Sequence, residues 1–165
     1  MHIRECILDF LAEISDSMRL ILTRNLALMK KVVDALFMVS LEKDPLNESG
    51  EQDYLRQLIL MLFGHLGKKL PRKKFYPIVM ENVKAFMSSQ DPLRQESAFY
   101  IMSYVAEWVT EIMKRDLKTP IMTQYIALGL RSPALETRVS SILCLSFLTQ
   151  YLQPDILEFH GDIYP

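Results

Sequence analysis

Glycine, cysteine and long apolar runs are all in short supply in this sequence. There are only five glycines in 165 residues, and long alternating runs of Val, Ile and Thr are missing, which disfavours a β-rich fold. Cys6 and Cys144 are too few and too far apart for a disulfide framework or a metal site, and they fit a reducing compartment. Apolar runs stay below the ~18 residues that cross a bilayer, and the order of a signal peptide is missing. We therefore expect a soluble cytosolic or nuclear protein.

The sequence also lacks an excess of charge and the motifs of catalysis. A net charge of −1 gives no reason to expect nucleic acid or an anionic membrane as a partner. His2, His65 and His160 are scattered and form no paired metal motif. Gly64–Gly67 lacks the strand and third glycine of a dinucleotide loop, and no Ser or Cys sits in a nucleophile elbow. These absences predict a protein that is not an enzyme and holds no metal or cofactor.

Apolar residues are abundant. They make up half of the sequence, and they recur with the spacing of a helix. Gly67 is expected just beyond a helix end with a positive φ, and Pro77 in the first turn of the next helix. An irregularity within one long helix is expected near Thr23–Asn25, and the polar stretch 42–53 is expected to be a loop. The pattern predicts helices over 3–14, 18–41, 54–66, 77–87, 93–108, 119–130 and 135–152.

These helices recur at a fixed interval. Pro77, Pro120 and Pro165 are separated by 43 and 45 residues, and Arg94 and Arg138 by 44 residues. Two interleaved markers that keep the same period are hard to obtain by chance. A period near 44 with two helices per unit is typical of HEAT repeats.

The predicted fold is therefore all-α, an α-solenoid of about four HEAT-type helix–turn–helix repeats. Residues 1–165 are expected to form a single array, with repeats near 1–42, 51–87, 93–130 and 135–165, the last one incomplete, and an acidic insertion at 42–53. The terminal repeats of a complete solenoid need a polar outer face. Neither end supplies one, so we expect an internal piece of a longer protein.

Several segments follow a pattern that is known from one family of helical-repeat proteins. They are Ile3-Arg4-Glu5-Cys6-Ile7-Leu8 with Leu11-Ala12-Glu13, Met38 to Asp44, Leu66 to Leu70 with Tyr76-Pro77, and Thr149 to Ile156 with Ile163-Tyr164-Pro165. Together they resemble the HEAT repeats of importin-β family nuclear transport receptors, the karyopherins, most of all the middle repeats of large members. The resemblance covers essentially the whole chain. Tyr100 and Tyr104 depart from the pattern, because they replace residues that are usually small, and the acidic insertion is shorter than usual.

The resemblance implies a scaffold that binds protein cargo, with basic proteins as the candidate cargo, and the Ran GTPase. It also implies that the scaffold contacts nucleoporins and shuttles between cytoplasm and nucleus. The sequence leaves an alternative open, a HEAT scaffold of another class, such as a phosphatase scaffold, a chromosome-organising subunit or a tubulin-binding array.

Two sets of residues are candidates for protein binding. In the resembling family, acidic insertions engage basic cargo or Ran, although a solvated linker is the commoner reading of such a loop. Along the second helices, a polar stripe is left after the core is assigned, and solenoids of this kind line their concave face with these helices. The loop candidates are Glu42, Asp44, Glu48, Glu51 and Asp53, and the stripe candidates are Glu81, Lys84 and Ser88, then Gln124, Ala127 and Arg131.

A basic cluster and a pair of arginines complete the candidates. The cluster could be a localisation signal or a patch for an acidic partner, but a solvated turn between helices is the favoured interpretation. Arg94 and Arg138 are expected to bond carboxylates or carbonyls of adjacent turns. The cluster consists of Lys68, Lys69, Arg72, Lys73 and Lys74.

Overall fold

In the computed structural model, residues 19–42 and 54–159 are described, and within these two stretches the chain is helical without a strand. The helix expected over 3–14 and most of the expected loop at 42–53 lie outside the described residues. The elements are α2 (Arg19–Arg24), α3 (Leu26–Val39), α4 (Tyr54–Lys69), α5 (Arg72–Met87), α6 (Pro92–Met113), η2 (Lys114–Asp116), η3 (Leu117–Ile126), α7 (Ala127–Leu130), α8 (Leu135–Tyr151) and η4 (Asp155–Phe159).

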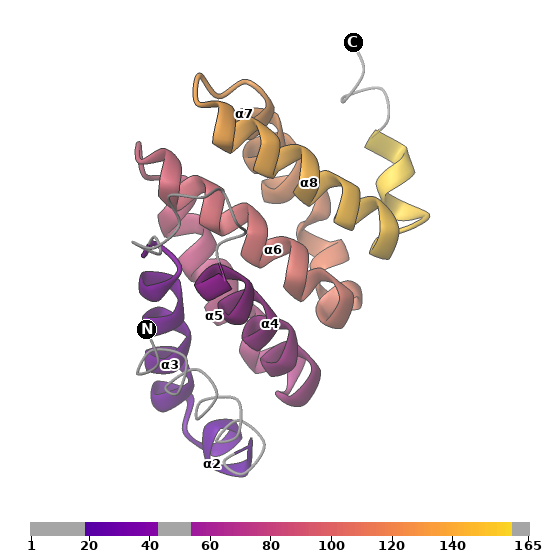
Figure 1. The fold of residues 1–165 in the computed structure, drawn as a ribbon. Helices are drawn as coiled ribbons and strands as arrows, with labels where there is room; N and C mark the ends of the chain where they lie inside the picture. The colour runs from indigo at the N-terminus through magenta and orange to yellow at the C-terminus, as the bar shows by residue number, and fades with distance from the viewer. Residues whose placement is uncertain (1–18, 43–53, 160–165) are drawn as a thin grey trace.

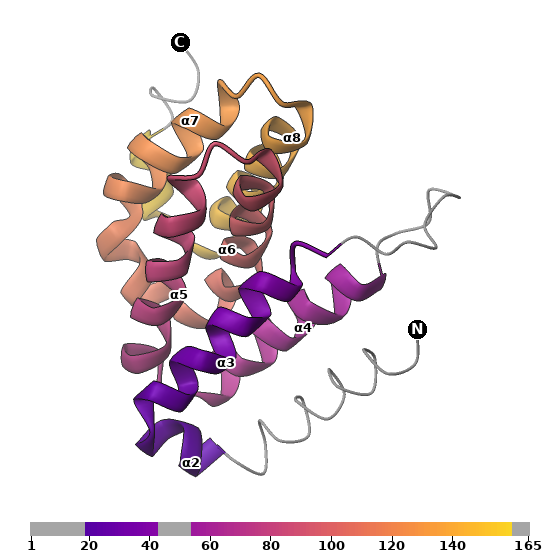
Figure 2. The same ribbon diagram turned by 90° about the vertical axis from the view of Figure 1, so that its left-hand side faces the viewer.

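The helices lie in two layers, which are seen edge-on in Figure 2. Helices α4, α6 and α8 form one layer, in which α6 packs against α4 on one side and α8 on the other (Figure 1). Helices α3 and α5 and the run from η3 to α7 form the second layer. The segments that follow Pro77 and Pro120 therefore occupy equivalent places in the stack, as the 43-residue period predicts.

Polar side chains set the starts of two helices, and the first of these divides the single helix that was expected over 18–41. The Asn25 side chain accepts a hydrogen bond from the Leu28 N–H at 3.0 Å, so α3 begins with its own cap and the run 19–39 breaks at Asn25. The Asp91 side chain caps α6 in the same way, and Pro92 follows in the first helical position.

The expectation for Gly67 is wrong. Helix α4 continues through Gly67 to Lys69, and Gly67 does not have a positive φ. A Cβ at this position would lie 3.2 Å from the Cβ of Trp108 on α6. Gly67 therefore permits a close approach of two helices and does not end one.

The expectation for Pro77 is also wrong, whereas that for Pro120 holds in part. Helix α5 begins at Arg72, so Pro77 lies inside it and leaves the carbonyl four residues earlier without its usual donor. Pro120 lies inside η3, but Thr119 before it has φ −139° and ψ 123°, which interrupts the helix. After Thr119 the chain is helical again, as π-helix to Ile126 and as α-helix from Ala127. The period shows that the two prolines are equivalent in successive repeats, but it does not show where in a helix each proline lies.

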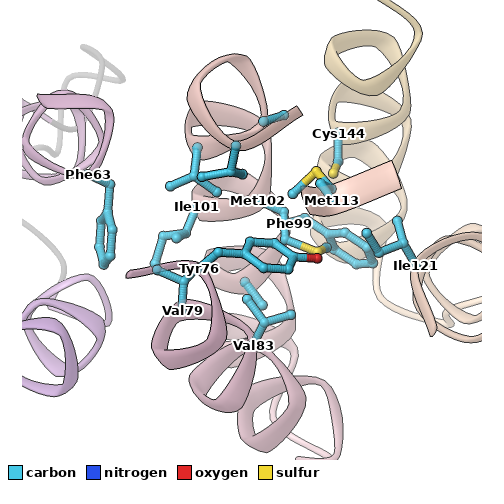
Figure 3. Close-up of a cluster of buried hydrophobic side chains, with 14 of the residues drawn as sticks. Phe63, Tyr76, Val79, Val83, Phe99, Ile101, Met102, Met113, Ile121 and Cys144 are labelled. Carbon is cyan, nitrogen blue, oxygen red and sulfur yellow. The ribbon is translucent and has the colours of Figure 1, made fainter. Parts of the chain in front are cut away.

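The core is continuous between the layers (Figure 3). Phe37 of α3 packs edge-on against Phe63 of α4 and Phe86 of α5, with ring centroids 5.3 and 5.1 Å apart. On the other side, Phe99 of α6 is completely buried. Burial also raises the pKa of the Cys144 thiol to about 12, so this cysteine is a core residue rather than a nucleophile.

Candidate protein-binding surface

The predicted stripe on α5 is exposed. Glu81, Lys84 and Ser88 are all solvent-accessible, whereas the side chains that the spacing assigned to the core are buried. The Ser88 hydroxyl donates to the Lys84 carbonyl at 2.8 Å, which ends the helix with a local bond. The exposure of the stripe is confirmed, and its role in binding stays a prediction. The buried set is Val79, Val83, Phe86 and Met87.

The equivalent stripe on η3 and α7 is only partly exposed. Gln124 and Arg131 are accessible, but Ala127 is half-buried. Of the acidic insertion, only Glu42 lies within the described residues, where it is exposed. The other four candidates, Asp44, Glu48, Glu51 and Asp53, lie outside them, so a binding role for this loop stays a prediction.

A groove of about 700 Å³ runs between α3 and α5 on the second layer. Two contacts join the helices around this groove. Lys30 of α3 pairs with Glu81 of α5, and the Lys74 ammonium of α5 donates to the Thr23 carbonyl of α2 at 2.8 Å. A hydrogen bond with Glu81 is the main cause that raises the pKa of Lys30. The groove is lined by Leu26, Ala27, Lys30, Lys73, Lys74, Pro77, Ile78 and Glu81.

The basic cluster is divided between two surfaces. Lys68 lies over the ring of Trp108, 5.3 Å from its centroid, on the α4–α6 side. Arg72, Lys73 and Lys74 form the exposed first turn of α5, and the last two line the groove described above. The cluster is therefore not a single surface, and two of its five members line the groove between α3 and α5.

A second groove, of about 380 Å³, lies between the turn after α5 and the turn after α7. It brings together Ser88 and Arg131, the last candidates of the two stripes. Arg138 shapes this turn by donating to the carbonyls of Ser132 at 2.7 Å and Pro133 at 3.0 Å. Arg94 instead lies 3.8 Å from a carboxylate oxygen of Asp91. Both arginines thus bond nearby turns, as expected.

Sequence reasoning missed a third, aromatic groove on the first layer. Arg56 of α4 pairs with Glu96 of α6 at 2.8 Å and lies over Tyr100, 5.5 Å from the ring centroid. The ring of Tyr104 stacks on Phe147 of α8 at 6.0 Å. Tyr100 and Tyr104 are four residues apart on one helix, and this spacing of two aromatics could have indicated a shared face. The groove has a volume of about 280 Å³.

Within residues 19–42 and 54–159, no three His, Cys, Asp or Glu side chains gather as a metal site would require. No helix in these two stretches is long and apolar enough to cross a membrane.

No family model matches the chain. The chain is 25% identical to mouse (Mus musculus) importin-4 over 109 residues, which cover 66% of the chain and 10% of that protein. Its fold matches crystal structures of Kap121p bound to Pho4p and to RanGTP, with TM-scores of 0.77 and 0.78 at 12% identity. Each match covers 94% of the chain and 16% of Kap121p, which establishes the α-solenoid fold.

Proposed function

We propose that the chain serves as a protein-binding part of a nuclear import receptor of the importin-β family, a proposal supported by its likeness to importin-4 and to Kap121p. Its partners in this role are protein cargo and the Ran GTPase. The observation that carries the proposal is the agreement of a sequence comparison with a fold comparison. One is a sequence match to an importin over two thirds of the chain, and the other is a fold match to a karyopherin over nearly all of it.

The two-layer stack suits this role physically. Each repeat contacts chiefly its neighbours, so a helical-repeat stack presents an extended surface on which many small contacts add up. Small sliding movements between packed helices change its curvature without breaking the core. The exposed candidates Glu81, Lys84, Ser88, Gln124 and Arg131 lie on the second layer, where we propose that cargo is held.

The acidic insertion is the proposed contact for basic cargo or for Ran. The five acids between Glu42 and Asp53 outnumber the single Lys43 in this stretch, and such a loop attracts a basic partner by long-range electrostatics. We further propose that the chain has no catalytic activity, binds no cofactor, contacts nucleoporins and shuttles between cytoplasm and nucleus with its receptor.

A pull-down with the 165-residue chain tests this function. The immobilised chain is incubated with a lysine-rich cargo protein, and separately with Ran loaded with GTP or GDP. We expect retention of the cargo, and stronger retention of GTP-loaded than of GDP-loaded Ran. If the chain retains neither partner, the transport role is refuted while the fold stands.

Charge reversal separates this function from that of another HEAT scaffold. Changing Asp44, Glu48 and Glu51 to Lys should abolish retention of basic cargo, because attraction becomes repulsion. The matched control reverses three exposed acids elsewhere on the described surface, Glu107, Glu136 and Glu158, and should leave retention unchanged. Equal loss in both triple variants would show a non-specific charge effect, and no loss in either would favour a scaffold of another class.

A further inference from the structure

The groove between α3 and α5 has a charge that the proposed cargo contact does not explain. Helices α2, α3 and α5 together carry a net charge of +6, although the whole sequence carries −1. Positive charge is therefore concentrated on these three helices. The basic residues are Arg19, Arg24, Lys30, Lys31, Arg72, Lys73, Lys74 and Lys84, and the acidic ones are Asp34 and Glu81.

The two acids on these helices are already engaged within the protein. Glu81 pairs with Lys30 across the groove, and the Asp34 carboxylate accepts a hydrogen bond from the Asn82 side chain at 2.7 Å. Arg72 and Lys73 are both exposed. The lining of the groove itself carries Lys30, Lys73 and Lys74 against the single acid Glu81, so its net charge is positive and favours an anionic partner.

The walls of the groove are apolar as well as basic. Leu26 is 52% exposed at the start of α3 and lines the groove together with Ala27, while Pro77 and Ile78 line it from α5. Exposed apolar surface rimmed by charge is typical of a site where another protein docks. The lysines can lay their aliphatic stems along this surface and keep their ammonium groups at the rim.

The chemistry of the walls distinguishes between two classes of anionic partner. Single-stranded nucleic acid is usually bound by aromatic side chains on which its bases stack. The eight residues that line the groove include no aromatic ring. Leucine, isoleucine, alanine and proline instead fit the apolar side chains of a peptide, with the lysines at the rim left to meet its carboxylates.

We propose that the α3–α5 groove binds an acidic protein segment in which apolar and carboxylate side chains alternate. The apolar side chains contact Leu26, Pro77 and Ile78. The carboxylates pair with Lys73 and with Lys30, where they compete with Glu81. This partner is distinct from the basic cargo of the proposed function, so the inference goes beyond that function.

Fluorescence anisotropy with the full chain tests the proposal. The probe is a short fluorescein-labelled peptide in which Glu alternates with Leu, compared with a version carrying Gln in place of Glu and with labelled poly(U) RNA. We expect the Glu peptide to bind about tenfold more tightly than the Gln peptide, because charge complementarity is lost in the latter. Its affinity should also fall as salt is raised.

Two substitutions locate the binding, each with a matched control. Lys73→Glu should weaken the Glu peptide about fivefold, whereas Lys118→Glu, an exposed lysine on η3, should not. Leu26→Gln should weaken it about threefold through lost apolar contact. Leu128→Gln, at a residue 63% exposed on α7, should have no effect. All four positions are exposed, so the variants should retain the helical circular dichroism of the parent.

Three results would overturn the proposal. The first is no binding of the Glu peptide to the parent chain. The second is equal weakening by Lys73→Glu and Lys118→Glu, which would mean diffuse attraction rather than a groove. The third is tighter binding of poly(U) RNA with the same dependence on Lys73, which would assign the groove to nucleic acid. None of these results bears on basic cargo or Ran, because those partners are assayed separately.

Discussion

Helix α5 and the run from η3 to α7 hold equivalent places in successive repeats. They differ in which helix supplies the large side chain at the contact with their neighbours. Phe86 and Gly129 are each nine residues beyond the proline of their repeat. Phe86 fills its own space and packs on Phe37. At Gly129 the space belongs to Phe99 of α6, whose ring atoms would lie 2.5 and 2.8 Å from an added Cβ. The repeated unit thus conserves helix placement, while the side chain that fills the contact comes from either partner.

The largest expected effect is the loss of the α5 contact. Phe86→Ala should reduce the free energy of unfolding by about 3–5 kcal/mol, because it removes a buried ring and leaves a cavity against Phe37. Denaturant unfolding followed by circular dichroism measures this change. Phe147→Ala, at a half-buried ring on α8, is the control and should cost clearly less. A cost below about 1 kcal/mol at Phe86 would remove it from the core.

The opposite change at the equivalent position should also destabilise. Gly129→Ala places a Cβ 2.6 Å from the Cβ of Ser141 as well as against Phe99, and overpacking of this kind costs about 1–3 kcal/mol. Gly64→Ala is the matched control, because its nearest neighbours are at 3.7 and 3.9 Å. Alanine there should stabilise the helix by up to about 1 kcal/mol. Equal effects at both glycines would contradict the close approach of α7 to α6 and α8.

Helix α5 and the run from η3 to α7 also differ in how their contribution to stability depends on pH, and this effect is smaller. Tyr76 of α5 is buried and donates to Asp116 at 2.8 Å, whereas its counterpart 43 residues later is Thr119. Burial, and then the bond to Asp116, raise the pKa of Tyr76 above its usual value of 10.0. The stability that the neutral phenol contributes is therefore complete below pH 10.0 and is lost as the pH rises above it.

Unfolding titrations above pH 10.0 measure this contribution. The free energy of unfolding of the parent should fall as the pH rises, and Tyr76→Phe should flatten the fall. The slope should not vanish, because burial also raises the pKa values of Tyr100 and Tyr125. An unchanged slope in the Tyr76→Phe variant would show that this phenol is not the group that responds.

The sequence predicts the bounds of most helices better than it predicts which side chains of different helices touch. Helix α8 was expected over 135–152 and is found at Leu135–Tyr151, because its apolar spacing and preceding turn are local signals. The start of α5 was missed, because its first turn is basic and Pro77 is a stronger local signal. At Gly67 the local sequence predicts a helix end. The structure instead requires a glycine there because Trp108, 41 residues away in the sequence, packs closely against it.

On the candidate surface, too, the sequence predicts which residues are exposed but not which residues of different helices form a groove. The exposure of Glu81, Lys84 and Ser88 follows from helical spacing alone. The α3–α5 groove does not, because it depends on which residues of α3 face α5, and Lys30 and Glu81 are 51 residues apart. The aromatic groove likewise needs Phe147 of α8 beside Tyr104 of α6. A periodic pattern assigns residues to faces, but the packing of two helices makes a groove.

The packing of equivalent helices is tested most directly by a double-mutant cycle between Gly129 and Phe99. Phe99→Leu alone should destabilise by leaving a cavity, and Gly129→Ala alone by its clash with the Phe99 ring. In the double variant the new methyl group occupies part of the vacated space. Its loss of unfolding free energy should therefore fall short of the sum of the single losses by about 1 kcal/mol or more. Additivity within about 0.5 kcal/mol would mean that α7 does not pack on α6, and would contradict the repeat stack.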